Sequence, residues 1–147
     1  MNCIIIYWSR YGHGKQIVEN LVDRLEKNEI ETSIHKPDDV DPKNIPEADL
    51  YVFSSPTEAF RIKSDMRKFM KKIEKLDGKK YGIINTHSMK RNWLKSMDKI
   101  LKKKGMKKLA EVDFQIGKEG AEKGEALPEG WERKLDNFAR NLTKKAS

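Results

Sequence analysis

The sequence predicts an α/β protein, built as a three-layer sandwich with a five-stranded parallel sheet in the middle. Three observations lead to this prediction. Apolar runs of strand length alternate with helical apolar stripes along the whole chain. The first run, residues 3–9, is apolar almost throughout, which is typical of a strand covered on both faces. No repeat or linker interrupts the pattern, so we expect a single domain over residues 1–147.

The first half of the chain predicts three strands and one helix. After the strand at residues 3–9, apolar residues recur at helical spacing over residues 17–25, with charged residues between them. Residues 30–34 alternate in polarity like a strand nearer a sheet edge. Residues 36–47 hold three prolines and predict a surface connection with at most one short turn. Residues 48–54 predict the next buried strand.

The second half of the chain predicts two further strands and three helices. The pair Asp77-Gly78 is a signal for the end of the first of these helices, and Pro128 opens the last one. In chain order we expect a loop at 55–61, a helix at 62–76, a strand at 80–85, a loop at 86–91, a helix at 93–104, a strand at 109–116, a polar loop at 117–127 and a final helix.

The turn between the first strand and the first helix has the composition of an anion site. Backbone N–H groups at a helix start point toward one place, and the positive end of the helix dipole adds to their field. Lys15 follows the turn, and no carboxylate precedes Glu19. These features predict a phosphate site, while a plain strand–helix turn with glycine as a hinge fits them equally well. The turn consists of Ser9, Arg10, Tyr11, Gly12, His13 and Gly14.

The predicted sheet brings this turn together with two other loops. The carboxyl ends of parallel strands meet at one edge, and ligands of open α/β sheets bind outside that edge. Residues 9–14, 55–61 and 86–91 each follow a predicted strand. We therefore expect these three loops to form the ligand site.

Four segments of the chain, in this order, carry a family resemblance. The first is Ile5-Ile6-Tyr7 followed by Ser9 and Gly12, with Gly14 closing the motif. The others are DDVDPKNIPEAD (38–49), DLYVFSSPT (49–57) and ALPEGWERKLDNFARNL (126–142). Together they resemble the flavodoxin family over essentially the whole chain. Gly14 departs from that family's pattern, because Thr is usual there.

The resemblance implies the flavodoxin-like strand order 2-1-3-4-5 and an electron-transfer protein that binds FMN non-covalently, with no catalytic side chain. Residues 9–14 would wrap the FMN phosphate. Two further groups would lie on either side of the flavin ring. The first is Pro56, Thr57, Glu58, Ala59 and Phe60, and the second is Thr86, His87, Ser88 and Trp93.

Several of these residues also have an interpretation without a flavin. Trp93 begins a helical stripe, so packing in the core is at least as compatible with its position. His87 also fits a solvated loop histidine. Gly14 removes a hydroxyl group, which leaves backbone N–H groups and Lys15 to bind the phosphate. Residues 54–61 contain no glycine, although flavodoxins often have one beside the flavin.

The charge of the chain is concentrated in one region. Residues 61–108 hold 18 Lys and Arg against four Asp and Glu, while the rest holds 13 against 19, and the net charge is +8. The strand order 2-1-3-4-5 places the helices at 62–76 and 93–104 on one face of the sheet. We expect this Lys-rich 61–108 region to face redox proteins with an acidic docking surface. A solvated lysine surface is the plainer alternative, and nucleic acid is a weaker one because no binding motif accompanies the lysines.

Other functional classes fit the sequence less well. A nucleotide-hydrolysing P-loop fails because Ser9 and Gln16 stand where Gly and Ser or Thr are needed. The histidines at 13, 35 and 87 are too scattered to predict a metal site. Two rivals stay open: a flavin-dependent quinone or porphyrinogen oxidoreductase on the same fold, and a flavin-free interaction module. The short loop at 86–91 favours an electron carrier over such an enzyme.

The chain also predicts its compartment. Cys3 is the single cysteine and begins a predicted inner strand, so we expect a core residue and not a redox thiol. No apolar run approaches the ~20 residues of a membrane span, so we expect no membrane insertion. No signal-peptide pattern opens the chain. Together these features predict a cytoplasmic protein.

Overall fold

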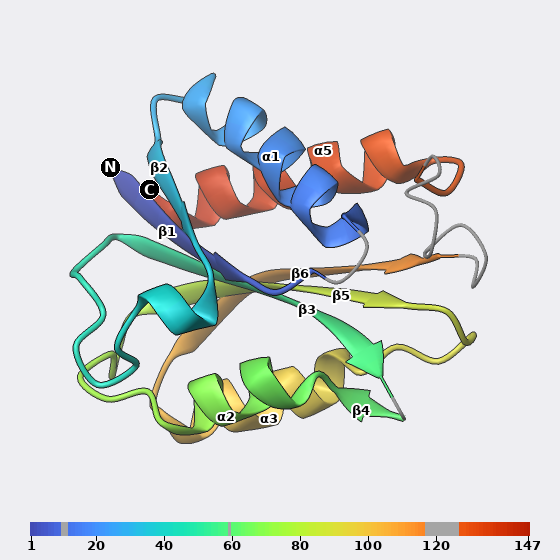
Figure 1. The fold of residues 1–147 in the computed structure, drawn as a ribbon. Coiled ribbons are helices and arrows are strands. Elements are labelled where there is room, and N and C mark those ends of the chain that lie inside the picture. Colours follow the sequence, from blue (N-terminus) through green and yellow to red (C-terminus); the bar gives the residue numbers. More distant parts are fainter. Residues whose placement is uncertain (10–11, 59, 117–126) are drawn as a thin grey trace.

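In the computed structural model, helices cover both faces of a central sheet (Figure 1). α1 (His13–Glu26) and α5 (Trp131–Ala146) lie on one face, and α2 (Ser64–Lys71) and α3 (Leu94–Lys103) lie on the other. This arrangement confirms the predicted three layers. The structure describes residues 1–9, 12–58, 60–116 and 127–147. The predicted site residues Arg10, Tyr11 and Ala59, and the predicted loop up to residue 126, lie outside the described residues.

The parallel strands run in the order β2-β1-β3-β5-β6, which confirms the predicted order once the short β4 is left out of the count. The prolines after β2 leave room only for the short 3-10 helix η1, as expected. The elements of the sheet and its first connection are β1 (Asn2–Tyr7), β2 (Glu31–His35), η1 (Pro37–Asp39), β3 (Leu50–Glu58), β4 (Arg61–Ile62), β5 (Lys80–His87) and β6 (Lys107–Gln115).

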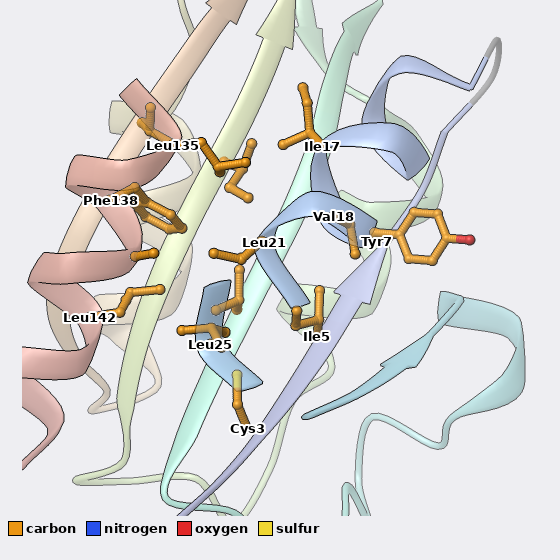
Figure 2. Close-up of a cluster of buried hydrophobic side chains, with 14 of the residues drawn as sticks. Cys3, Ile5, Tyr7, Ile17, Val18, Leu21, Leu25, Leu135, Phe138 and Leu142 are labelled. Carbon is orange, nitrogen blue, oxygen red and sulfur yellow. The ribbon is translucent and has the colours of Figure 1, made fainter. Parts of the chain in front are cut away.

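The apolar run of β1 serves two cores at once. Cys3, Ile5 and Tyr7 pack into the core under α1 and α5, while Ile4 and Ile6 pack into the core under α2 and α3. Figure 2 shows the first of these cores, with side chains of α1 and α5 meeting over the strands. Burial raises the pKa of the Cys3 thiol to about 12, which is the behaviour of a packed core residue.

Gly82 in β5 lets α5 approach the sheet closely. A Cβ atom at this position would lie 2.7 Å from Leu142 Cδ2 and 3.0 Å from Phe138 Cζ. Both side chains are buried in the core under α1 and α5. A larger residue at position 82 would therefore force the side chains of Leu142 and Phe138 to move.

The prediction of a loop at residues 55–61 is wrong for the first residues of that range, which belong to a strand. β3 continues to Glu58, because its backbone still pairs with β5, where Pro56 lies opposite Thr86. The chain then turns back into β4, which pairs antiparallel to β3 with Thr57 opposite Ile62. Phe60 takes a left-handed backbone conformation in this β3–β4 hairpin, with φ 63°. The apolar pattern does not predict this extension of β3, because most of its residues are polar and backbone hydrogen bonds hold them in the strand.

The helix predicted at residues 62–76 is also too long. α2 ends at Lys71, and Ile73 and Leu76 enter the core from an irregular segment. The spacing of apolar residues indicates which of them are buried, and it does not require the backbone between them to stay helical.

Asp98 links α3 to the sheet through a hydrogen bond and an ion pair. The Tyr81 hydroxyl of β5 donates a hydrogen bond to its carboxylate, and the ammonium groups of Lys102 and Lys108 lie 2.8 and 3.2 Å from Oδ2. Burial alone would raise the pKa of the Asp98 carboxyl, but these three donors outweigh burial and hold that pKa below its usual value. Burial, and then the bond to Asp98, raise the pKa of Tyr81 above its usual value.

None of the helices in the described parts of the chain has the length and apolar character that a bilayer crossing requires.

We predict that Asp98→Asn lowers the free energy of unfolding by about 1–3 kcal/mol at pH 7, because Tyr81 and two lysines lose a charged acceptor. A carboxyl whose pKa is lowered by folding contributes stability above its unfolded pKa and loses it as the pH falls through the folded value. The cost should therefore shrink toward pH 3, as measured by urea unfolding.

Asp23→Asn, at an exposed position of α1, serves as the control. Equal costs in the two variants at pH 7, or a cost for Asp98→Asn that does not change with pH, would contradict this assignment.

Candidate functional site

The turn after β1 presents the start of α1 as an anion site. The Gly12 N–H donates a hydrogen bond to Ser9 Oγ at 3.1 Å. Gly12 has φ 98°, which glycine adopts without the strain that a Cβ atom would bring. No side chain of the described residues caps α1, and its first turn holds no acidic residue. Backbone N–H groups there can meet a phosphate, and the helix dipole favours its charge.

Gly14 is fitted to this turn by its small size. A Cβ atom at Gly14 would lie 3.3 Å from Ser9 Cβ and 3.4 Å from the Trp8 carbonyl oxygen. These distances are at the short limit of ordinary contact, so Ser9 would have to move to admit a side chain. Glycine in place of Thr thus has a structural reason, because a residue without a Cβ atom lets Ser9 pack closely against the start of α1.

His13 offers an independent sign of a ligand in the turn. Its side chain is buried, and its Nε2 atom has no hydrogen-bond partner within the described parts of the chain. A buried nitrogen without a partner costs free energy, and an anionic oxygen beside it would supply the missing bond. Together with the uncapped helix start, this nitrogen fits a phosphate in the turn.

A pocket of about 270 Å³ opens at the carboxyl ends of β3 and β5. Phe60, 70% exposed on the β3–β4 hairpin, and the half-buried Trp93 are its aromatic residues. Such flat side chains suit a planar ring. We call this pocket the flavin pocket, after the ring that the sequence analysis expects there. Its lining residues are Thr57, Phe60, His87, Ser88, Met89, Arg91 and Trp93.

Three predicted site residues lie beside the pocket without lining it. Pro56 and Thr86 are opposite each other in the ladder between β3 and β5. Glu58 ends β3, and its carboxylate lies 3.3 Å from Lys63 Nζ. These residues shape the pocket wall through the backbone. A direct contact of each predicted residue with the flavin stays a prediction.

Asn85 joins both walls of the flavin pocket, although the sequence analysis did not select it. Its side chain is fully buried, and Nδ2 donates to the Ser55 carbonyl and to Thr57 Oγ1, both at 3.0 Å. Its Oδ1 atom accepts the Trp93 N–H at 2.8 Å, which holds the start of α3. One signal was present in the sequence: an amide in an otherwise apolar inner strand needs partners.

His87 is buried and firmly held, so its interpretation as a solvated loop histidine is wrong. Its Nδ1 atom lies 2.6 Å from the Met89 carbonyl oxygen, and Nε2 lies 2.6 Å from Asp113 Oδ2. The ammonium group of Lys134 in α5 lies 3.7 Å from Asp113 Oδ1. The two contacts of His87 fix the orientation of its ring in the wall of the pocket.

Trp93 serves both of the roles that the sequence left open. It packs partly against the core under α2 and α3, and it lines the flavin pocket. The Arg91 guanidinium lies 4.1 Å from the centre of its ring, which is a cation–π distance. Trp8 is held in a similar way, with Lys63 Nζ 4.6 Å from its ring centre.

The described residues contain no group of three or more His, Cys, Asp or Glu side chains that could hold a metal ion.

Comparisons with known proteins agree with this geometry. A family model described as a flavodoxin domain matches residues 4–122. A search of curated protein sequences gave no match. Among solved structures, the flavodoxin of Streptococcus pneumoniae TIGR4 is 19% identical, with a TM-score of 0.81 and 99% of each chain covered. Oxidised Flavodoxin 2 from Bacillus cereus is 17% identical, with a TM-score of 0.82 and 99% of each chain covered.

The fold also occurs as part of a larger protein. Rubredoxin oxygen:oxidoreductase from Desulfovibrio gigas is 14% identical to the chain, with a TM-score of 0.79. The match covers 99% of this chain and 36% of that one. At such identities the likeness to solved structures shows the fold.

We predict that Gly14→Thr weakens the site, although it restores the residue that is usual in the family. The added Cβ presses on Ser9, and such overpacking costs about 1–3 kcal/mol. Both the free energy of unfolding and the affinity for FMN should fall, as measured by urea unfolding and by fluorescence titration.

Gly14→Val is the matched control, because valine has nearly the shape of threonine and lacks the hydroxyl. The two variants should lose similar amounts. A gain in FMN affinity for Gly14→Thr alone would show that the hydroxyl outweighs the crowding and would refute the steric explanation.

Proposed function

Because the chain belongs to the flavodoxin family and is an FMN-binding electron-transfer protein, we propose that it holds FMN across the carboxyl edge of β1, β3 and β5 and carries electrons between protein partners. The phosphate would bind in the turn of residues 9–14, and the flavin ring would lie in the flavin pocket.

The position of the two parts at the same edge of the sheet is the observation that supports this proposal most directly. β1 and β3 are neighbours, yet α1 leaves to one face of the sheet and α2 to the other. Such a reversal opens a crevice at the strand ends, where ligands of this architecture bind. The turn with the uncapped helix start follows β1, and the aromatic pocket follows β3 and β5.

FMN, when bound, supplies one- and two-electron redox chemistry, and the chain supplies binding and electrostatics. Backbone N–H groups after Ser9 and the buried His13 nitrogen would hold the phosphate. Phe60 and Trp93 would lie beside the ring and exclude water from it. His87, held by Met89 and Asp113, would keep the wall of the pocket in place. None of the described residues is needed as an acid or a base.

We propose a carrier and not a substrate-converting enzyme. The segment between β5 and α3 is short, and the flavin pocket of about 270 Å³ leaves little room for a second molecule over a flavin. A quinone or porphyrinogen oxidoreductase needs such room. The single cysteine is buried, in keeping with a cytoplasmic location for this carrier.

The partners we propose are redox proteins that present an acidic surface to the Lys-rich 61–108 region. α2 and α3 lie side by side on one face, and both carry exposed lysines (Figure 1). An anionic partner would be attracted to this face and oriented by it, and salt would weaken the encounter. The exposed lysines are Lys68 and Lys71 of α2, Lys72 at its C-cap, and Lys95, Lys99, Lys102 and Lys103 of α3.

The absorption spectrum tests the proposed cofactor site. We expect the purified protein, or the apoprotein after addition of FMN, to show oxidised-flavin bands near about 370 and 450 nm. Riboflavin should bind at least about tenfold more weakly, because it lacks the phosphate that the turn would hold. If saturating FMN gives no bound flavin, the chain is a flavin-free interaction module and the proposal fails.

The choice between carrier and enzyme needs a second measurement. A carrier should not reduce quinones when NADH or NADPH is the sole electron donor. Rapid quinone reduction under those conditions would identify the enzyme.

We predict that His87→Gln weakens FMN binding. The glutamine amide has hydrogen-bond donors at one end only, so it cannot replace both contacts that hold the ring between the Met89 carbonyl and the Asp113 carboxylate. Loss of one such contact costs on the order of 1 kcal/mol, or about fivefold in the dissociation constant for FMN, as measured by fluorescence titration.

His35→Gln provides the control, since His35 in β2 contacts Ser33 Oγ and lies outside the flavin pocket. An FMN affinity that stays unchanged in His87→Gln, or that falls equally in the control, would show that His87 does not hold the pocket wall in place for the flavin.

A further inference from the structure

A second groove adjoins the flavin pocket on the side of α2 and α3. It has a volume of about 520 Å³ and shares Phe60, Arg91 and Trp93 with the flavin pocket. Its other walls come from β4, from the first turn of α2 and from α3. The shared residues mean that a molecule in this groove would touch the rim of the flavin pocket.

Three arginines converge on the groove, and no acidic side chain of the described residues lines it. They are Arg61 of β4, Arg67 of α2 and Arg91 before α3. Within the described residues, no carboxylate pairs with any of these guanidinium groups. Lys63, two residues after Arg61, is paired with Glu58 instead.

Two of the arginines are held in place. Arg67 donates one N–H to the Ile62 carbonyl at 3.1 Å, which leaves its other donors available. Arg91 lies over the Trp93 ring. A guanidinium group fixed in this way loses little freedom when it binds, and its planar donor pairs match a carboxylate.

The rest of the lining is apolar. Ile62, Ile100 and Trp93 contribute carbon surface beside the arginines. A ligand that satisfies both the arginines and the apolar lining needs carboxylates together with an apolar side chain. The exposed lysines of α2 and α3 surround this groove, and they would attract an extended acidic surface much more than a single small anion.

We propose that this arginine groove is the docking point for an acidic protein segment that bears an apolar side chain between its carboxylates. The inference rests on the proposed function, since the occupant would be the redox partner, and it deepens that function by locating the contact. Electrons would then leave the flavin pocket through its rim at Phe60 and Trp93, which the docked segment would cover.

The test uses the full chain with added FMN and a capped fluorescent peptide of alternating glutamate and leucine. We expect Arg61→Gln with Arg67→Gln to weaken peptide binding at least about tenfold, which is the loss typical of charged hydrogen bonds. The charge-conserving pair Arg61→Lys with Arg67→Lys should still lose about threefold, because lysine lacks the planar fork. Circular dichroism and thermal unfolding check that each variant is folded. If Arg67→Gln unfolds the protein, Arg61→Gln alone takes the place of the pair, because Arg61 is exposed.

The matched control removes the same charge from the opposite face of the molecule. Lys27 at the end of α1 and Lys144 of α5 are both exposed, and Lys27→Gln with Lys144→Gln should change peptide affinity less than about twofold. Equal losses in this pair and in Arg61→Gln with Arg67→Gln would overturn the groove, because net charge alone would explain binding. Unchanged binding in the two-lysine replacement of the arginines would overturn it too.

Two further outcomes separate the alternatives. A single-stranded oligonucleotide of equal charge that displaces the peptide and binds more tightly would identify a nucleic-acid surface and refute the inference. FMN titration of the same samples keeps the two proposals apart. Peptide binding that depends on the arginines, in a protein that does not bind FMN, would refute the proposed function alone. FMN binding together with peptide binding that does not depend on the arginines would refute the groove alone.

Discussion

Both faces of the inner strands have to be covered, and this constraint organises the whole molecule. β1 sends Cys3 and Ile5 into one core and Ile4 and Ile6 into the other, so a single layer of helices would leave half of the strand in water. The chain answers by placing α1 and α5 on one face and α2 and α3 on the other (Figures 1 and 2). The change of face between α1 and α2 is also what opens the crevice at the end of β1 and β3.

The polar residues begin where the apolar strands end. Asn85 marks the change from apolar to polar residues in β5, because it is buried and yet forms hydrogen bonds to the end of β3 and the start of α3. Two residues later, His87 spans the Met89 carbonyl and the Asp113 carboxylate. Such paired polar groups are stable in a buried position only when all partners are present. The network thereby fixes the pocket before any ligand arrives, which reduces the entropy that binding costs.

Charge and shape divide the surface into two working regions. The turn at the start of α1 and the flavin pocket are small and suited to one cofactor, whereas α2 and α3 offer a broad basic face. The groove with Arg61, Arg67 and Arg91 lies where the two regions meet. In the proposed docking, the lysines would attract the partner at long range and the arginines would recognise it at short range, and the two groups lie close enough on this face for one partner to use both.

The sequence by itself determined the fold class, because burial periodicity is a local property of the chain, and the family resemblance supplied the strand order. A phosphate in the turn of residues 9–14 stays a prediction. The sequence also identified Phe60, His87 and Trp93 as residues at one edge of the sheet. Tertiary structure alone decided that β3 extends into a hairpin with β4, and that Asp113 holds His87 from 26 positions away. The partners of Asn85 and the convergence of the arginines were hidden for the same reason: they depend on strand register and helix docking, which bring together residues that no local pattern relates.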